Sequence, residues 1–178
     1  MTRGRQEVLE RYRKSYPDGE AMGTLSFDLI DVRPVAGTEI SMLGDARGAA
    51  PGGFLLLDQK FDVVGRWETS THGMNFNYDF WYQPRLNVMV SSEWAAPKTV
   101  ACGFQLEDVE AGKYGRHLNF WDWNKRSLVQ SVDLGSDGLI PLEVRFHHDP
   151  NSHHGFVGAA LSSSIWHWHR KDTDWRVE

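Results

Sequence analysis

Residues 119–123 read Asn-Phe-Trp-Asp-Trp, and a similar stretch, Ser-Ile-Trp-His-Trp, follows at residues 164–168. Both tryptophans of the first stretch lie 45 residues before their counterparts in the second. Each stretch has bulky side chains at every second position, which is the pattern of a half-buried β-strand. Strands that recur about every 40–50 residues are typical of β-propellers, whose blades stack because one four-stranded sheet cannot bury its faces alone.

Two weaker repeats favour this interpretation over a chance similarity of two Trp-rich strands. Residues 53–68 share with residues 118–133 the order of apolar strand, polar turn and returning strand. Residues 80–84 likewise resemble residues 146–150, where a strand runs into a proline-containing turn. The proline is 21 residues farther from the Trp-rich strand in the first copy, which predicts an insertion over much of residues 95–116.

The sequence therefore predicts an all-β fold, a partial β-propeller with WD40-like blades of four-stranded antiparallel sheet. We expect two full blades and part of a third, whereas a closed propeller needs at least four. Residues 24–178 form this domain, and residues 1–23 form a charged N-terminal extension with a short helix over residues 2–16. Strands are expected at residues 79–82, 88–92, 118–123, 128–133, 142–146, 156–161, 165–169 and 175–177.

Composition argues against several classes of function. The 178 residues carry a net charge of −5, and their lysines and arginines form no basic stripe, so we expect no nucleic-acid partner. No apolar run approaches the ~18 residues of a membrane span, and the first residues lack the apolar core of a signal peptide. We therefore expect a cytoplasmic protein. Open blade edges would favour self-association.

Cys102 is the only cysteine, which excludes an internal disulfide. It lies inside the expected insertion. Its local sequence shows neither the base nor the positive charge that activates a thiol. We interpret Cys102 as an incidental, partly exposed residue.

Several longer strings are similar to one known family. They are Tyr-Asp-Phe-Trp-Tyr-Gln-Pro-Arg at 78–85, Ser-Glu-Trp-Ala-Ala-Pro at 92–97, Asp-Val-Glu-Ala-Gly-Lys-Tyr-Gly at 108–115 and Gly-Leu-Ile-Pro-Leu-Glu-Val-Arg-Phe at 138–146. With Ser-Met-Leu-Gly-Asp at 41–45 and Gly-Phe-Val-Gly-Ala-Ala-Leu-Ser-Ser at 155–163, they resemble the selenium-binding protein family from about residue 40 onward.

The resemblance implies a β-propeller that oxidises methanethiol with oxygen and water to formaldehyde, hydrogen sulfide and hydrogen peroxide. It also implies copper as the metal of the catalytic members, and selenium carried by a cysteine in a Ser-Ser-Cys stretch. Family members are associated with the cytosol, the nucleus and the membrane periphery, and with protein transport within the Golgi.

The chain departs from the family pattern in several places. It has no Ser-Ser-Cys stretch and no His-His-Ser-Gly-Trp segment, and residues 31–38 lack the histidines of the family's His-Thr-Ser-His segment. The family's His-Glu-Leu-Arg segment is also absent, and Leu86 stands where many members have a histidine. We therefore expect an internal portion of a longer propeller, with an incomplete metal site and no family cysteine for selenium.

Two of the eight histidines match family positions: His117 in Tyr-Gly-x-His-Leu and His148 in Arg-Phe-x-His-x-Pro. Both are candidate copper ligands, because imidazole suits copper and strand ends converge on a propeller's channel. His148 is the better candidate, since it precedes a turn, but a turn histidine bonded to the backbone explains it equally well. Acidic residues in matched motifs are candidates for supporting a ligand or for acid–base chemistry: Asp79, Glu93 and Glu143. No residue is assigned a catalytic role.

The remaining histidines have simpler interpretations. A turn separates the pairs at 147–148 and 153–154, so we expect the second pair at a solvent-facing hairpin tip. His167 and His169 alternate with tryptophans and share one face of a strand. A polar blade surface is the preferred interpretation of this face, and adventitious metal binding is the alternative.

Five aromatic residues are expected to pack blade against blade rather than to stack on a ligand: Phe80, Trp81, Trp94, Trp121 and Trp123. Two functions remain open from the sequence. One is a methanethiol oxidase. The other is a non-catalytic partial propeller that binds selenium or a partner.

Overall fold

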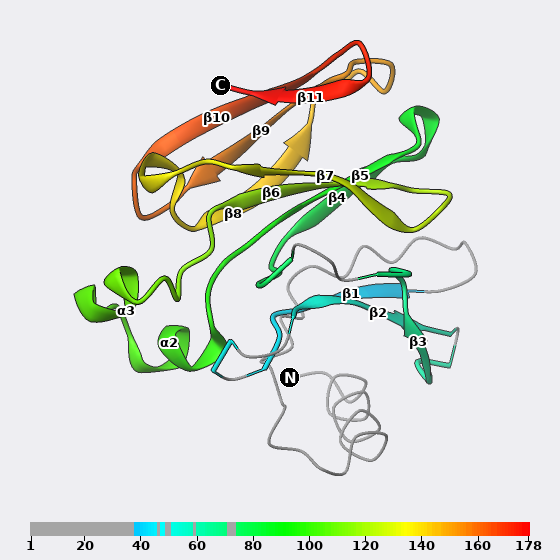
Figure 1. The fold of residues 1–178 in the computed structure, drawn as a ribbon. Coiled ribbons are helices and arrows are strands. Elements are labelled where there is room, and N and C mark those ends of the chain that lie inside the picture. Colours follow the sequence, from blue (N-terminus) through cyan, green and yellow to red (C-terminus); the bar gives the residue numbers. More distant parts are fainter. Residues whose placement is uncertain (1–37, 46, 49–50, 59, 71–73) are drawn as a thin grey trace.

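The computed structural model describes residues 38–45, 47–48, 51–58, 60–70 and 74–178 (Figure 1). Its strands are β1 (Thr38–Met42), β2 (Gly53–Leu57), β3 (Val63–Arg66), β4 (Phe80–Gln83), β5 (Val88–Ser92), β6 (His117–Asp122), β7 (Ser127–Asp133), β8 (Pro141–Phe146), β9 (His154–Ala159), β10 (Ser164–Lys171) and β11 (Asp174–Val177). Short helical segments connect some of them: η2 (Pro84–Leu86), α2 (Pro97–Cys102), α3 (Leu106–Glu110) and η3 (Ser136–Gly138). The extension expected at residues 1–23 lies outside the described residues.

The strands form three antiparallel sheets, β1–β3, β4–β7 and β8–β11, and in each sheet the strand order follows the chain. Every sheet is therefore an antiparallel meander, as a propeller blade is. Two of the sheets have four strands, and the described part of the other has three. The prediction of an all-β partial propeller with two full blades and part of a third is confirmed.

The sheet β4–β7 lies between the other two and is buried on both faces (Figure 1). In β5, Val88 and Val90 belong to the core shared with the β8–β11 sheet. Met89 between them belongs to the core shared with the β1–β3 sheet. Because both faces are covered, every residue of β5 is buried and the strand shows no alternation of buried and exposed positions.

The Trp-rich repeat marks the third strand of each four-stranded sheet, β6 and β10. Trp121 is fully buried against the β1–β3 sheet, with its ring edge-on to Phe54 at 5.4 Å between centroids. In the second copy the fully buried residue is Trp168, and Trp166 is only partly buried. Gly155 lies opposite Trp168 on β9 and leaves the space for its indole, since a Cβ at Gly155 would be 2.0 Å from Trp168 Cζ2.

The expected packing of aromatic residues between blades holds for four of the five. Phe80, Trp121 and Trp123 pack in the core with β1–β3, and Trp81 packs against the core with β8–β11. Trp94 differs, because it lies beside the insertion with its ring edge-on to Tyr78 at 4.7 Å between centroids.

The insertion expected at residues 95–116 contains α2 and α3, which lie at one side of the stacked sheets (Figure 1). An antiparallel bridge between Ala95 and Tyr114 closes it. The insertion therefore leaves the end of β5 and returns to the start of β6 beside the point where it left. Among the described residues, no helix has the length and apolar character needed to cross a bilayer.

Candidate functional site

Glu93 and His117 meet where the insertion leaves and rejoins the sheet. Ser92, the last residue of β5, pairs with Leu118 in β6, so the residues just beyond them lie opposite each other. These residues are Glu93 and His117, which are 24 positions apart in the sequence. The closed insertion therefore brings a carboxylate and an imidazole to the same end of two neighbouring strands.

Glu93 is a buried carboxylate with only 1% of its surface exposed. Its Oε2 lies 2.8 Å from Nδ1 of His117 and accepts the backbone N–H of His117 at 3.3 Å. Its Oε1 accepts the backbone N–H of Asn75 at 3.4 Å. Buried carboxylates need such donors, because an unpaired charge away from water is costly.

The hydrogen bond to Glu93 raises the pKa of His117 above its ordinary value, while partial burial opposes the shift. A carboxylate that accepts from one ring nitrogen also fixes the tautomer, so that the neutral imidazole carries its proton on Nδ1. Nε2 of His117 then has a free lone pair. The pair therefore forms a proton acceptor with a stabilised protonated state.

Gly115 allows the two segments to approach this closely. A Cβ at this position would lie 2.4 Å from Cβ of Glu93, which is far inside van der Waals contact. The Gly115 N–H donates to the carbonyl of Trp94 at 2.6 Å and ties the insertion to the residue after Glu93. A larger residue at position 115 would displace the carboxylate.

A cleft of about 250 Å³ adjoins the pair and is lined by Glu93 and His117 together with Asn75, Tyr114, Arg116 and Leu139, among others. Asp133 stands near its rim, with Oδ2 at 3.9 Å from Nε2 of His117. Both oxygens of Asp133 are held by Arg116, at 2.9 Å each. The cleft thus combines one buried acid–base pair with an ion pair near its opening.

Copper fits this arrangement only in part. His117 has the outer carboxylate that metal-binding histidines usually have. However, Asp133 is already paired with Arg116, and within the described ranges His117 belongs to no group of three or more metal-binding side chains. Copper sites in proteins are built from several imidazole or sulfur ligands. Among the described residues, His117 thus lacks the further imidazole ligands that a copper site needs, and its role as a copper ligand stays a prediction.

The other residues singled out in the sequence lie elsewhere. His148 is exposed in the turn between β8 and β9, with its ring tilted against that of His147 at 4.2 Å between centroids. Glu143 is an exposed carboxylate 3.6 Å from Arg145. Asp79 is fully buried and accepts the backbone N–H of Val144 at 2.7 Å, so it ties one sheet to the next.

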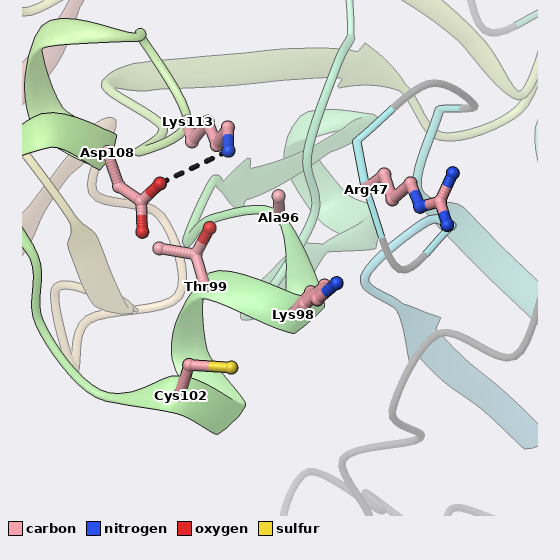
Figure 2. A pocket seen from close by; sticks show the side chains of 7 residues that line it. All are labelled: Arg47, Ala96, Lys98, Thr99, Cys102, Asp108 and Lys113. Atoms are coloured by element: carbon pink, nitrogen blue, oxygen red, sulfur yellow. Dashed lines mark ion pairs between the residues drawn. The ribbon is translucent and has the colours of Figure 1, made fainter.

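Cys102 is exposed at the end of α2 and lines a cleft of about 380 Å³ with three basic side chains, Arg47, Lys98 and Lys113 (Figure 2). Lys113 is paired with Asp108 at 3.1 Å. The expectation that no positive charge accompanies this cysteine is therefore wrong, because Lys98 belongs to the same helix and the fold brings Lys113 and Arg47 to the cleft. Selenium held through a cysteine would have to use this thiol, since the chain has no other.

His153 and His154 are exposed at the end of the β8–β9 hairpin, as expected, and His154 also joins a cluster of histidines on β9 and β10. His154 is the first residue of β9, and its ring stacks on that of His167 with 5.0 Å between centroids. The ligand atoms of His167, His169 and Glu178 all lie within 4.8 Å of one another. The sequence showed that His167 and His169 share a face. It did not show that His154 of β9 and Glu178 after β11 join them, because this depends on strand register.

Comparison with known proteins places the chain in a family. Methanethiol oxidase of Xenopus laevis is 57% identical to the chain over 141 residues, which cover 78% of the chain and 30% of the relative. Human methanethiol oxidase is 52% identical over the same length. The crystal structure of a hypothetical selenium-binding protein from Sulfolobus tokodaii superposes with a TM-score of 0.73 at 38% identity, covering 80% of the chain and 32% of that protein.

The chain thus spans about 30% of the length of these curated relatives. The sequence profile of the 56kDa selenium binding protein family matches residues 28–178, which include both four-stranded sheets and the Glu93–His117 pair. The chain therefore belongs to the selenium-binding protein family, SBP56.

Proposed function

We propose that this chain takes part in the oxidation of methanethiol by oxygen and water to formaldehyde, hydrogen sulfide and hydrogen peroxide. The observation that supports this most strongly is its identity of 52–57% over 141 residues with proteins named methanethiol oxidase. Because the chain spans about 30% of those proteins, the proposal concerns the part of the reaction that the described residues can perform.

That part is the removal of the thiol proton. Glu93 holds the proton on Nδ1 of His117, which leaves Nε2 as the base. Transfer of the S–H proton to Nε2 gives methanethiolate and an imidazolium, and the Glu93 carboxylate stabilises the imidazolium. The cleft of about 250 Å³ has ample room for a substrate of one carbon and one sulfur. No described residue is assigned a step in the later transfer of electrons to oxygen.

The test is to incubate the purified chain with methanethiol and oxygen and to measure the release of hydrogen sulfide and hydrogen peroxide. His117→Gln should lower the rate by about 10²–10⁴-fold, the usual range for loss of a general base. His153→Gln removes an exposed imidazole elsewhere and should leave the rate unchanged. Absence of both products from a folded wild-type sample would contradict the proposal, and so would equal rates in the two variants.

A second candidate function, a non-catalytic module that binds a partner, is supported by a different surface. Phe156 and Ile165 lie on the open face of the β8–β11 sheet, and 46% and 78% of their surfaces are exposed. Exposed apolar residues of this size favour association with a second copy of the chain or with another protein.

Sedimentation velocity of the wild type and of Ile165→Lys tests this alternative. If the face mediates self-association, the wild type should sediment as a dimer or larger species and the variant should shift toward monomer. A wild-type monomer at all concentrations would argue against self-association through this face.

A further inference from the structure

The open face of the β8–β11 sheet carries a compact group of imidazoles and one carboxylate. In β10, His167 and His169 are two positions apart and therefore point to the same face. His169 pairs with His154 on β9. Glu178, directly after β11, exchanges both backbone hydrogen bonds with His167, at 2.8 and 2.9 Å. Residues directly opposite in antiparallel strands share a face, so the register of three strands places all four side chains together.

The side chains converge as well as share a face. Oε1 of Glu178 lies 3.6 Å from Nδ1 of His167 and 3.7 Å from Nδ1 of His169. In a tetrahedral site with metal–ligand bonds of about 2.0–2.1 Å, ligand atoms are about 3.3 Å apart. The two spacings from Glu178 exceed this value by only a few tenths of an ångström, and all three ligand atoms lie within 4.8 Å of one another.

Two further observations favour a ligand at this place. Nδ1 of His169 is shielded from solvent and has no hydrogen-bond partner, and a buried polar atom without a partner is unfavourable unless something binds it. Nδ1 of His154 lies 2.8 Å from Nε2 of His167. If Nε2 of His167 donates to His154, its Nδ1 presents a lone pair toward Glu178, and an outer partner of this kind orients metal-binding histidines.

We propose that His167, His169 and Glu178 form a zinc-binding site on the outer face of the β8–β11 sheet, with His154 orienting His167. Two imidazoles and a carboxylate with an open fourth position are a common zinc ligand set. By affinity alone zinc ranks above iron and below copper, so the ligand set and a tetrahedral geometry are what favour zinc, and magnesium prefers oxygen ligands alone. The site shares no residue with the Glu93–His117 pair and does not depend on the proposed oxidation.

The experiment titrates the 178-residue chain with Zn²⁺ by isothermal titration calorimetry, with Mg²⁺ as the control ion. One Zn²⁺ should bind per chain with release of protons, because histidine ligands must be neutral. His169→Gln and His167→Gln should each weaken the affinity by about a hundredfold, and His154→Gln by about tenfold. His147→Gln removes an exposed imidazole outside the group and should change the affinity less than twofold.

Glu178→Gln provides a variant that leaves the fold intact, because 72% of the Glu178 side chain is exposed. It should weaken Zn²⁺ binding, and Co²⁺ bound to the wild type should show the visible absorption of a tetrahedral site. Equal Zn²⁺ affinity in the wild type and in His169→Gln, binding as weak as that of Mg²⁺, or half an equivalent of zinc in a dimer would each overturn the proposal.

Discussion

Asp79, the residue before β4, accepts the backbone N–H of Val144 in β8 and so joins two sheets through a fully buried carboxylate. The same Oδ2 accepts from Arg145 at 2.9 Å, and Oδ1 accepts the N–H of Phe80 at 2.9 Å. β8 is the edge strand of its sheet, so a carboxylate from the neighbouring sheet can bind the Val144 N–H in place of another strand. The contact therefore fixes how the two sheets stack.

This carboxylate should make stability depend on pH. Burial raises the pKa of Asp79 to about 6 in the folded protein, against hydrogen bonds from Val144 and the charge of Arg145, which lower it. In the unfolded state the carboxyl has its ordinary pKa of 3.8, so between these two pKa values the folded state keeps a proton that the unfolded state has lost. The free energy of unfolding should therefore fall as the pH rises through this window, by about 3 kcal/mol for this group.

Asp79→Asn tests this dependence, since asparagine does not titrate. Urea unfolding at about pH 4 and about pH 7 measures the free energy of unfolding of both proteins. The wild-type value minus the variant value should be smaller at the higher pH. Glu143→Gln, which removes an exposed carboxylate beside the same Arg145, should show no such change. A difference that stays constant across this range would contradict the expected titration.

Glu93→Gln should lower the pKa of His117 toward its ordinary value, because the hydrogen bond that His117 donates to Glu93 is the main cause of the raised pKa. A raised histidine pKa stabilises the fold fully below the unfolded value of about 6.5, and this contribution is lost as the pH rises through the folded pKa. The variant should therefore lose stability mainly at the lower pH. An NMR titration of the His117 ring protons, assigned by their loss in His117→Gln, measures the shift directly.

Glu143→Gln also serves as the control for this titration, because Glu143 is exposed and contacts Arg145 instead of a histidine. It should leave the His117 titration where it is in the wild type. If Glu93→Gln and Glu143→Gln give the same His117 titration curve, Glu93 does not set the pKa of His117.

The stacked sheets could be predicted from the sequence because their pattern is local. In β9, exposed and buried residues alternate along the strand, and the Trp-rich stretches at 119–123 and 164–168 mark equivalent strands. A repeat of this kind requires only short-range order, so strand type and blade count follow from it.

The sites could not be predicted in the same way, because each depends on register between distant strands. Glu93 meets His117 only because the bridge between Ala95 and Tyr114 closes the insertion. His154 reaches His167 and His169 only through the register of β9 with β10, and a shift by one residue would turn its side chain to the other face. Register at this level is set by turns and bulges that the apolar pattern does not show.

Two glycines on the same strand test the close packing behind Trp168. Gly155→Ala places a Cβ 2.0 Å from Cζ2 of Trp168 and should destabilise the protein by about 1–3 kcal/mol, the usual cost of overpacking. Gly158→Ala on the same strand has no atom within 4 Å of its new Cβ and should be neutral or slightly stabilising. Thermal unfolding of both variants measures the difference. Equal melting temperatures would show that the indole does not occupy this position.

Trp121→Phe tests the repeat itself in the core between the β4–β7 and β1–β3 sheets. Trp121 is fully buried, its Nε1–H donates to Ser91 Oγ at 3.0 Å, and its ring packs edge-on against Phe54 and Trp67. Phenylalanine keeps part of the apolar contact but leaves a void and an unpaired hydroxyl, so we expect a loss of about 1–3 kcal/mol.

Trp123→Phe is the matched control, because Trp123 is only partly buried and stacks on Tyr82 at 4.6 Å, a contact that phenylalanine can keep. In urea unfolding of both variants, Trp123→Phe should lose much less free energy of unfolding than Trp121→Phe. Trp121 and Trp123 belong to the same copy of the repeat. If both variants lose the same free energy of unfolding, deeper burial against the β1–β3 sheet does not make Trp121 more important. The repeat would then reflect the strand pattern alone and not the packing of one blade on the next.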